Sequence, residues 1–197
     1  MTDEKLMDAA RALVKAMNRF VDENLPSELA EIVKTHSKGA AIAGVAGGWI
    51  PGVGGSAAIL TAAGFVWTMY GRINSAIQLP FSENVLKSVA SGVATNIAAY
   101  AAGSVALSTA FSIFPGLGNV AASVIAGGTS YALTLASGYV YLKVLTRLFQ
   151  SGKDPTSISA EELNRTAKKV VEQEDMKAVM REAKQAYKKA KASGEIK

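Results

Sequence analysis

Between Gly39 and Leu142 the sequence contains only three side chains that are charged at neutral pH, namely Arg72, Glu83 and Lys87. The segments on either side are as charged as an ordinary soluble protein. The central stretch instead has the composition of a bundle interior or of a membrane segment. Whatever the chain folds into must shield this stretch from water.

Two short sequences interrupt the uncharged stretch, Ile50-Pro51-Gly52-Val53-Gly54 and Phe114-Pro115-Gly116-Leu117-Gly118. Each has an apolar, helix-like run on both sides. Proline ends a helix, and glycine permits the left-handed turn that follows, so each sequence predicts the tip of a helical hairpin. The residues expected to contact a membrane or a partner are Trp49, Ile50, Pro51, Gly52, Val53, Gly54, Phe114, Pro115, Gly116, Leu117 and Gly118.

The two hairpins are related by an internal repeat. A shift of 64 residues aligns Pro51-Gly52, Gly54 and Ala57-Ala58 with Pro115-Gly116, Gly118 and Ala121-Ala122. Small residues let the returning helix approach closely, as at Gly44-x-x-x-Gly48. The repeat predicts one hairpin architecture used twice.

Apolar residues at three- and four-residue spacing, with caps and prolines at the boundaries, predict helices throughout. The expected helices cover 2–24, 27–50, 56–77, 83–114, 120–150 and 160–187, with Ser56 and Asn119 as caps and a break near Glu174-Asp175. Ser159-Ala160-Glu161-Glu162 has capping-box spacing, and residues 188–197 are expected to fray. The predicted fold is all-α: two antiparallel Ala/Gly-rich hairpins (38–150) flanked by an N-terminal amphipathic arm (1–37) and a charged C-terminal arm (151–197).

The net charge of +5 comes from residues 143–197, which include the C-terminal arm and carry thirteen basic and eight acidic side chains. Such an excess suits anionic lipid, nucleic acid or an acidic protein, although a solvated helix face is the commoner meaning. If the central helices alternate in direction, both tips share one end and the flanking charges share the other. This predicted basic end consists of Lys38, Arg72, Lys87, Lys143 and Arg147, with Glu83 as its acidic member.

Helix length separates the two hairpins. The ascending side of the first, from Lys38 to Pro51, gives only about 20 Å of helix, whereas Lys87 to Pro115 gives about 40 Å. A hydrocarbon core is ~30 Å thick, so the first hairpin would be shallow and the second deep. The expected fourth helix, 83–114, contains many Ala, Ser and Thr residues, which disfavour insertion into a membrane. A soluble helical bundle is therefore the alternative.

The residues for most catalytic chemistry are missing. The chain has no cysteine, and its single histidine, His36, lies beside the charged end of a helix. Neither glycine-rich tip is followed by the lysine of a phosphate-binding loop. The sequence therefore predicts no enzyme, no catalytic or metal site and no cofactor. Its first residues lack the layout of a signal peptide, so a cytoplasmic location is expected, at the face of a membrane or inserted with cytoplasmic termini.

The order of motifs resembles one known family. An Ala/Gly-rich helix, Ile-Pro-Gly-Val-Gly, the helix end Met69-Tyr70-Gly71-Arg72-Ile73, a long apolar helix, Phe-Pro-Gly-Leu-Gly and Ala121-Ala122 resemble the domain of unknown function 697 over residues 36–150. Members are often fused to or encoded beside GTPase domains and carry apolar hairpins thought to be membrane-associated. The resemblance implies the same surroundings for this chain, with any GTPase as a separate partner.

These features favour a non-enzymatic, membrane-associated helical hairpin protein that acts in recruitment or self-assembly and could be accessory to a separate GTPase. The expected partners are membrane lipid and a protein partner or a second copy of the chain, and nucleic acid is not expected. A soluble helical-bundle interaction module or oligomeric scaffold is the alternative. A pore-forming protein that hides an apolar hairpin inside a soluble bundle is a third hypothesis.

Overall fold

The computed structural model describes residues 27–48, 54–76, 79, 87, 89–90, 92–93, 97, 117–151 and 158–196. They form helices α2 (Ser27–Gly48), α3 (Gly54–Ala76), α5 (Leu117–Gln150), α6 (Ala160–Gln173) and α7 (Met176–Ala192). No strand occurs among these residues, so the predicted all-α class is confirmed. The expected helix at 2–24 lies outside the described residues, as does most of 83–114, of which Lys87, Val89, Ala90, Gly92, Val93 and Ile97 are helical.

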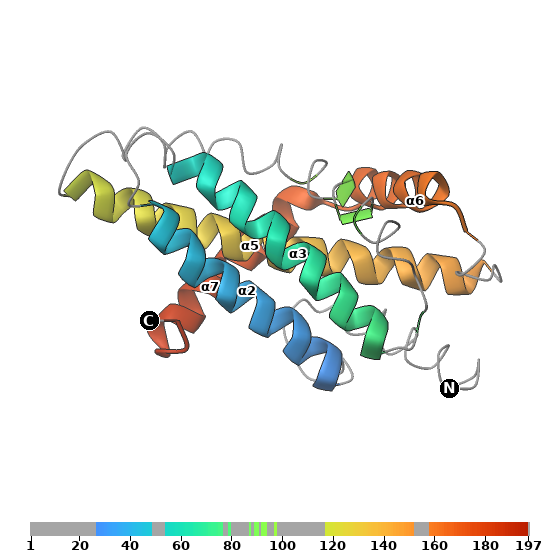
Figure 1. The fold of residues 1–197 in the computed structure, drawn as a ribbon, viewed down its shortest axis with the longest axis horizontal. Coiled ribbons are helices and arrows are strands. Elements are labelled where there is room, and N and C mark those ends of the chain that lie inside the picture. The colour runs from blue at the N-terminus through green and yellow to red at the C-terminus, as the bar shows by residue number, and fades with distance from the viewer. Residues whose placement is uncertain are drawn as a thin grey trace.

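The first predicted hairpin is formed by α2 and α3, which both pack against α5 (Figure 1). α2 runs antiparallel to α5, because Gly44 faces Ser130 whereas Val33 faces Gly138. α3 runs parallel to α5. The Tyr70 hydroxyl donates to the Ser137 carbonyl, and four residues further along both helices the Tyr141 hydroxyl donates to Asn74.

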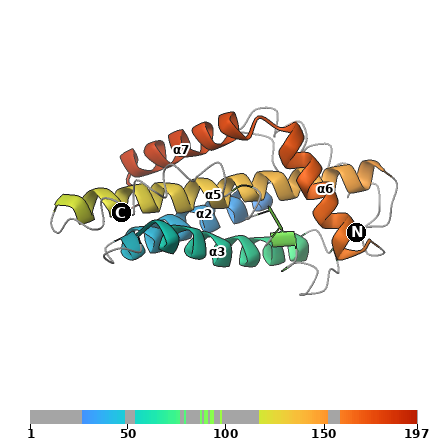
Figure 2. The same cartoon turned by 90° about the horizontal axis from the view of Figure 1, so that it is seen from above.

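α5 is the central helix and contacts α2, α3, α6 and α7. The α2–α3 hairpin lies on one side of it and α7 on the other (Figure 2). Its side chains from Ala126 to Thr134 are all buried. The uncharged stretch is thus shielded in part by the amphipathic C-terminal helices, which place Leu163, Ala167, Met176, Met180 and Ala183 in the core.

Small residues set the spacing between α2 and α5. A Cβ added at Gly127 would lie only 2.5 Å from Val45 Cγ2 and 3.0 Å from the carbonyl oxygen of Ala41. Gly44 is equally close to Ser130 and to the Ala126 backbone. The two helices therefore approach as closely as the glycine pattern predicts.

The predicted cap at Ser159 and the predicted break near Glu174-Asp175 are confirmed. Ser159 caps α6 and accepts a hydrogen bond from the backbone N–H of Glu162 at 3.2 Å. The chain breaks at Glu174, and Asp175 caps α7 by accepting from the N–H of Ala178 at 3.0 Å. Side-chain caps satisfy N–H groups that the first turn leaves without partners.

Three expected boundaries are wrong. α3 begins at Gly54 and α5 at Leu117, so neither Ser56 nor Asn119 is a helix cap. The tail does not fray from residue 188, because α7 continues to Ala192 and Gly194 then turns the chain at φ 76°. Ile196 is buried beyond that turn. The tail is held by contacts with residues far away in the sequence, which helix propensity cannot predict.

Candidate interaction surface at the hairpin end

One end of the bundle is where α2 ends at Gly48, α3 begins at Gly54 and α5 begins at Leu117; we call it the hairpin end (Figure 1). Three predicted tip residues are described, because Gly54 opens α3 and Leu117 and Gly118 open α5. The others lie outside the described residues: Trp49, Ile50, Pro51, Gly52, Val53, Phe114, Pro115 and Gly116.

α5 reaches further than α2 at the hairpin end. The pairs Gly44–Ser130 and Val45–Gly127 place Gly48 opposite about residue 123 of α5. The six residues of α5 beyond that point extend about 9 Å at 1.5 Å per residue. Figures 1 and 2 both show the first turns of α5 projecting beyond α2 and α3.

Exposed large apolar side chains collect near this end. Among the described residues they are Ile42 (52% exposed), Leu60 (74%) and Val124 (38%). Each lies within about 11 Å of the helix terminus at the hairpin end, by the rise of an α-helix. The adjoining parts of α2, α3 and α5 carry no charged side chain. The hairpin end is therefore apolar and uncharged.

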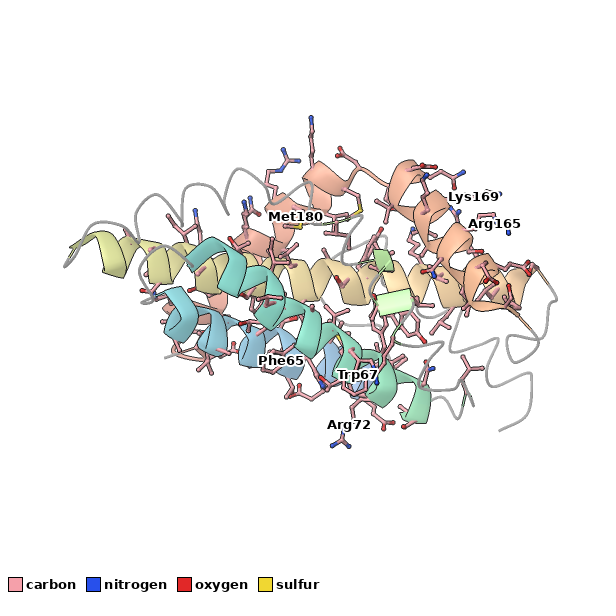
Figure 3. The ribbon with its side chains drawn as sticks, turned by 45° about the horizontal axis from the view of Figure 1, so that its top comes forward. Phe65, Trp67, Arg72, Arg165, Lys169 and Met180 are labelled. Carbon is pink, nitrogen blue, oxygen red and sulfur yellow. The ribbon has the colours of Figure 1, made fainter. Side chains whose placement is uncertain are left out.

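The outer face of α3 continues this uncharged surface. Ala63, Gly64 and Thr68 are exposed, and a Cβ added at Gly64 would meet nothing within 4 Å. The first charge on this face is Arg72, whose side chain points away from the bundle (Figure 3). About 18 Å of helix separate Arg72 from Leu60.

Lys38 and Lys143, two members of the predicted basic end, bind different acidic side chains. Lys38 Nζ lies 2.5 Å from Glu195 Oε2, just beyond the C-terminus of α7, whereas Lys143 Nζ lies 3.0 Å from Glu174 Oε1, just before its N-terminus. The pairs Val33–Gly138 and Gly44–Ser130 place Lys38 opposite about residue 134 of α5, about 14 Å from Lys143 along that helix. The sequence did not predict these two ion pairs, because each acidic partner is far from its lysine along the chain.

The other members of the predicted basic end lie apart from Lys38. Arg72 is in the last turns of α3, and Arg147 is half-buried in the last turn of α5. Lys87 places its ammonium group 4.9 Å from the ring centre of Trp67, a cation–π contact. Glu83 lies outside the described residues.

Glu174 anchors the joint between α6 and α7 to α5. Tyr139 donates its hydroxyl to Glu174 Oε2 at 2.7 Å, and the Lys143 ammonium lies 5.5 Å from the Tyr139 ring centre. Partial burial opposes ionisation of Glu174, but the hydrogen bonds from Tyr139 and Lys143 outweigh it and lower the pKa of the carboxyl. Burial and the bond to Glu174 raise the pKa of Tyr139. The contacts among Glu174, Tyr139 and Lys143 therefore hold the joint between α6 and α7 against α5.

The C-terminal turn ties α7 to α2, and we call it the C-terminal clasp (193–196). Glu195 binds both Lys38 and Lys34, the latter at 3.2 Å, and Ile196 packs with Ala41, Tyr131 and Tyr187. Hydrogen bonds from Lys38, Lys34 and Ser193 lower the pKa of Glu195 to about 2. No local signal in the sequence pointed to this contact.

The described residues offer no site for catalysis by a metal. They contain no group of three or more His, Cys, Asp or Glu side chains that could hold a metal ion. The ring of His36 is half-buried, with Nδ1 2.7 Å from the carbonyl oxygen of Ile32. None of the helices, over the residues that the structure describes, is long and apolar enough to be a candidate membrane span.

Comparisons with protein-family models, with curated proteins and with solved structures gave no match. The resemblance to the domain of unknown function 697 therefore stays a prediction. The structure defines a class of fold. It is an all-α bundle around one central helix that has no charged side chain before Lys143, with an apolar end and charged amphipathic helices along one side.

Proposed function

We propose that this protein is a non-enzymatic, membrane-associating helical protein that touches the cytoplasmic face of a membrane with its hairpin end. The observation that carries the proposal is the collection of Ile42, Leu60 and Val124 at the uncharged end from which α5 projects. Exposed apolar side chains gathered at one uncharged end of a protein are typical of a surface that interacts with an apolar partner or with lipid.

The geometry supports shallow contact. The first turns of α5 reach about 9 Å beyond α2, and Val124 and Leu60 follow at about 11 and 15 Å from the start of α5. Contact that includes them is slightly deeper than the 5–10 Å at which interfacial helices lie in the headgroup and acyl boundary. Full burial of a Leu, Ile or Val side chain contributes about 1.5–3 kcal/mol, so three partly exposed ones give weak, reversible attachment. The charged α6 and α7 would remain available for recruitment of other proteins.

A flotation assay with liposomes and no detergent tests the proposal. Leu60→Lys places a charge at the hairpin end and should reduce the bound fraction severalfold. Thr68→Lys is the matched control, because Thr68 is exposed on the same helix but about 12 Å further from that end. Equal binding of L60K and the unmodified chain would overturn the proposal.

Self-assembly is the second candidate, and the outer face of α3 favours it. Ala63, Gly64 and Thr68 leave the backbone open to a close helix neighbour. Sedimentation of the full chain without lipid tests this version. A dimer that Gly64→Leu converts to a monomer would support it, and a monomer at all concentrations would exclude it.

A further inference from the structure

Three exposed lysines, Lys188, Lys189 and Lys191, lie at the C-terminal end of α7; we call them the lysine cluster. No ion pair joins any of the three to another described residue. The nearest acidic side chain in sequence, Glu195, already binds Lys34 and Lys38. The cluster therefore presents its positive charge to the surroundings.

The packing of α7 on α5 fixes how far the lysine cluster lies from the hairpin end. Tyr187 lies against Gly127 and Gly128, whereas Glu174 binds Tyr139 and Lys143, so α7 runs antiparallel to α5. This register places Lys188 to Lys191 opposite about residues 124–127 of α5. They are about 11–16 Å from the start of α5, at the level of Leu60 and Val124.

Two other exposed basic residues of α7 lie far from the hairpin end. Lys177 and Arg181 fall opposite about residues 135–139 of α5, which is about 26–33 Å from its start. They share the helix, the exposure and the charge of the lysine cluster. They differ from it in distance from the apolar end, and so they provide an internal comparison.

Helix stability explains only part of the cluster. Lys189 and Lys191 lie in the last turn, where a positive charge interacts favourably with the free carbonyl groups. Lys188 precedes that turn. The dipole also gives no reason for three lysines to lie at the same level as the exposed apolar side chains of α3 and α5.

We propose that the lysine cluster binds the anionic headgroups of acidic lipids when the hairpin end touches a membrane. This inference rests on the proposed function and adds the lipid class. With Leu60 and Val124 at the apolar boundary, the lysine cluster lies at the same level, and its flexible side chains extend from there to phosphate or carboxylate groups. Each lysine near an anionic surface strengthens binding about fivefold.

Acidic lipid suits the cluster better than nucleic acid does. A nucleic acid strand lying along α7 would contact Lys177 and Arg181 as well as the lysine cluster, because all lie on exposed positions of one helix. A membrane at the hairpin end contacts only the cluster. The two partners thus predict different patterns of loss among otherwise similar variants.

The experiment compares two double variants of the full chain on two kinds of vesicle. Lys188→Gln with Lys191→Gln removes two charges from the cluster, and Lys177→Gln with Arg181→Gln removes two charges from the distal part of α7. The vesicles are pure phosphatidylcholine and phosphatidylcholine with phosphatidylglycerol. Circular dichroism and thermal unfolding establish that both variants are folded like the unmodified chain.

We expect K188Q/K191Q to lower binding to the anionic vesicles about 25-fold, at roughly fivefold for each lysine, and to leave binding to neutral vesicles unchanged. K177Q/R181Q should change binding to either kind of vesicle by less than about threefold, because those charges lie more than a Debye length from the membrane surface. Equal losses in the two variants, or none in K188Q/K191Q, would overturn the inference.

The controls separate this inference from the proposed function. If the chain binds neutral and anionic vesicles alike and no lysine matters, only the lipid preference is wrong. If it binds neither vesicle, both proposals fail. Binding of a short DNA or RNA duplex that is reduced equally by both variants would assign the basic surface to nucleic acid instead.

Discussion

The hydroxyl group of Tyr141 donates a hydrogen bond to Asn74 Oδ1, 2.5 Å away, inside the interface between α5 and α3. Both side chains are buried, and the Tyr141 ring stacks on Tyr70 with ring centres 3.9 Å apart. This pair fixes the register of the two parallel helices. It is also one of the few polar contacts that the uncharged core contains.

Replacing Tyr141 with Phe should destabilise the fold by about 1–3 kcal/mol, because Asn74 Oδ1 would be left buried without its donor. Asn74 Nδ2 already lacks a partner among the described residues. Urea denaturation measures the change. A double-mutant cycle with Asn74→Ala isolates the pair, and strictly additive losses would show that the hydrogen bond contributes nothing.

Alkaline pH should unfold the protein through its buried tyrosines. Burial raises the pKa of Tyr70 and of Tyr141 above the usual value of 10. The unfolded chain therefore loses these protons first, and the stabilisation that is complete below about pH 10 declines as the pH rises above it. Ultraviolet titration should show that Tyr70 and Tyr141, at the least, ionise only on unfolding. Ionisation of all six tyrosines near pH 10 in the folded state would contradict this.

Acid should weaken the C-terminal clasp. Hydrogen bonds from Lys38 and Lys34 hold the folded pKa of Glu195 at about 2, below the ordinary value of 4.5 for a glutamate. Its stabilising effect is therefore present above about pH 4.5 and is lost as the pH falls toward 2. Glu195→Gln should lower the melting temperature at pH 7 but not at pH 2. Glu161→Gln, at an exposed position of α6, is the control. A loss of the same size at both pH values would contradict the assignment.

Two glycine substitutions should have opposite effects on stability. Gly127→Ala forces a Cβ against Val45 and the Ala41 backbone, so we expect a loss of about 1–3 kcal/mol. Gly64→Ala meets nothing within 4 Å on the exposed face of α3 and should stabilise by up to about 1 kcal/mol through helix propensity. Thermal unfolding of the two variants checks the pair. Similar effects of both would mean that α2 and α5 are not in close contact.

The sequence predicted the parts of the fold that local chemistry controls. Ser159, Asp175 and the break at Glu174 follow from capping preferences that act within a few residues. The helix starts at Gly54 and Leu117 were missed because Ser56 and Asn119, the residues expected as caps, each lie inside the first turn of the helix.

The missed contacts all depend on residues far apart in the chain. The burial of Ile196 requires Ala41 and Tyr131, and the partner of Lys38 is Glu195. The Pro-Gly tips stay a prediction from the sequence. The position of the lysine cluster beside the apolar end depends instead on the register of α7 on α5. No pattern within α7 alone encodes that register.

The length of α5 has a mechanical consequence. Its 34 residues form one continuous rod of about 50 Å, with the projecting first turns at one end and Lys143, bound to Glu174, near the other. A helix packed on several sides moves as a rigid body. A tilt of α5 at the hairpin end would therefore displace the joint between α6 and α7. Binding at one end would thus move the other end without unfolding of the helix.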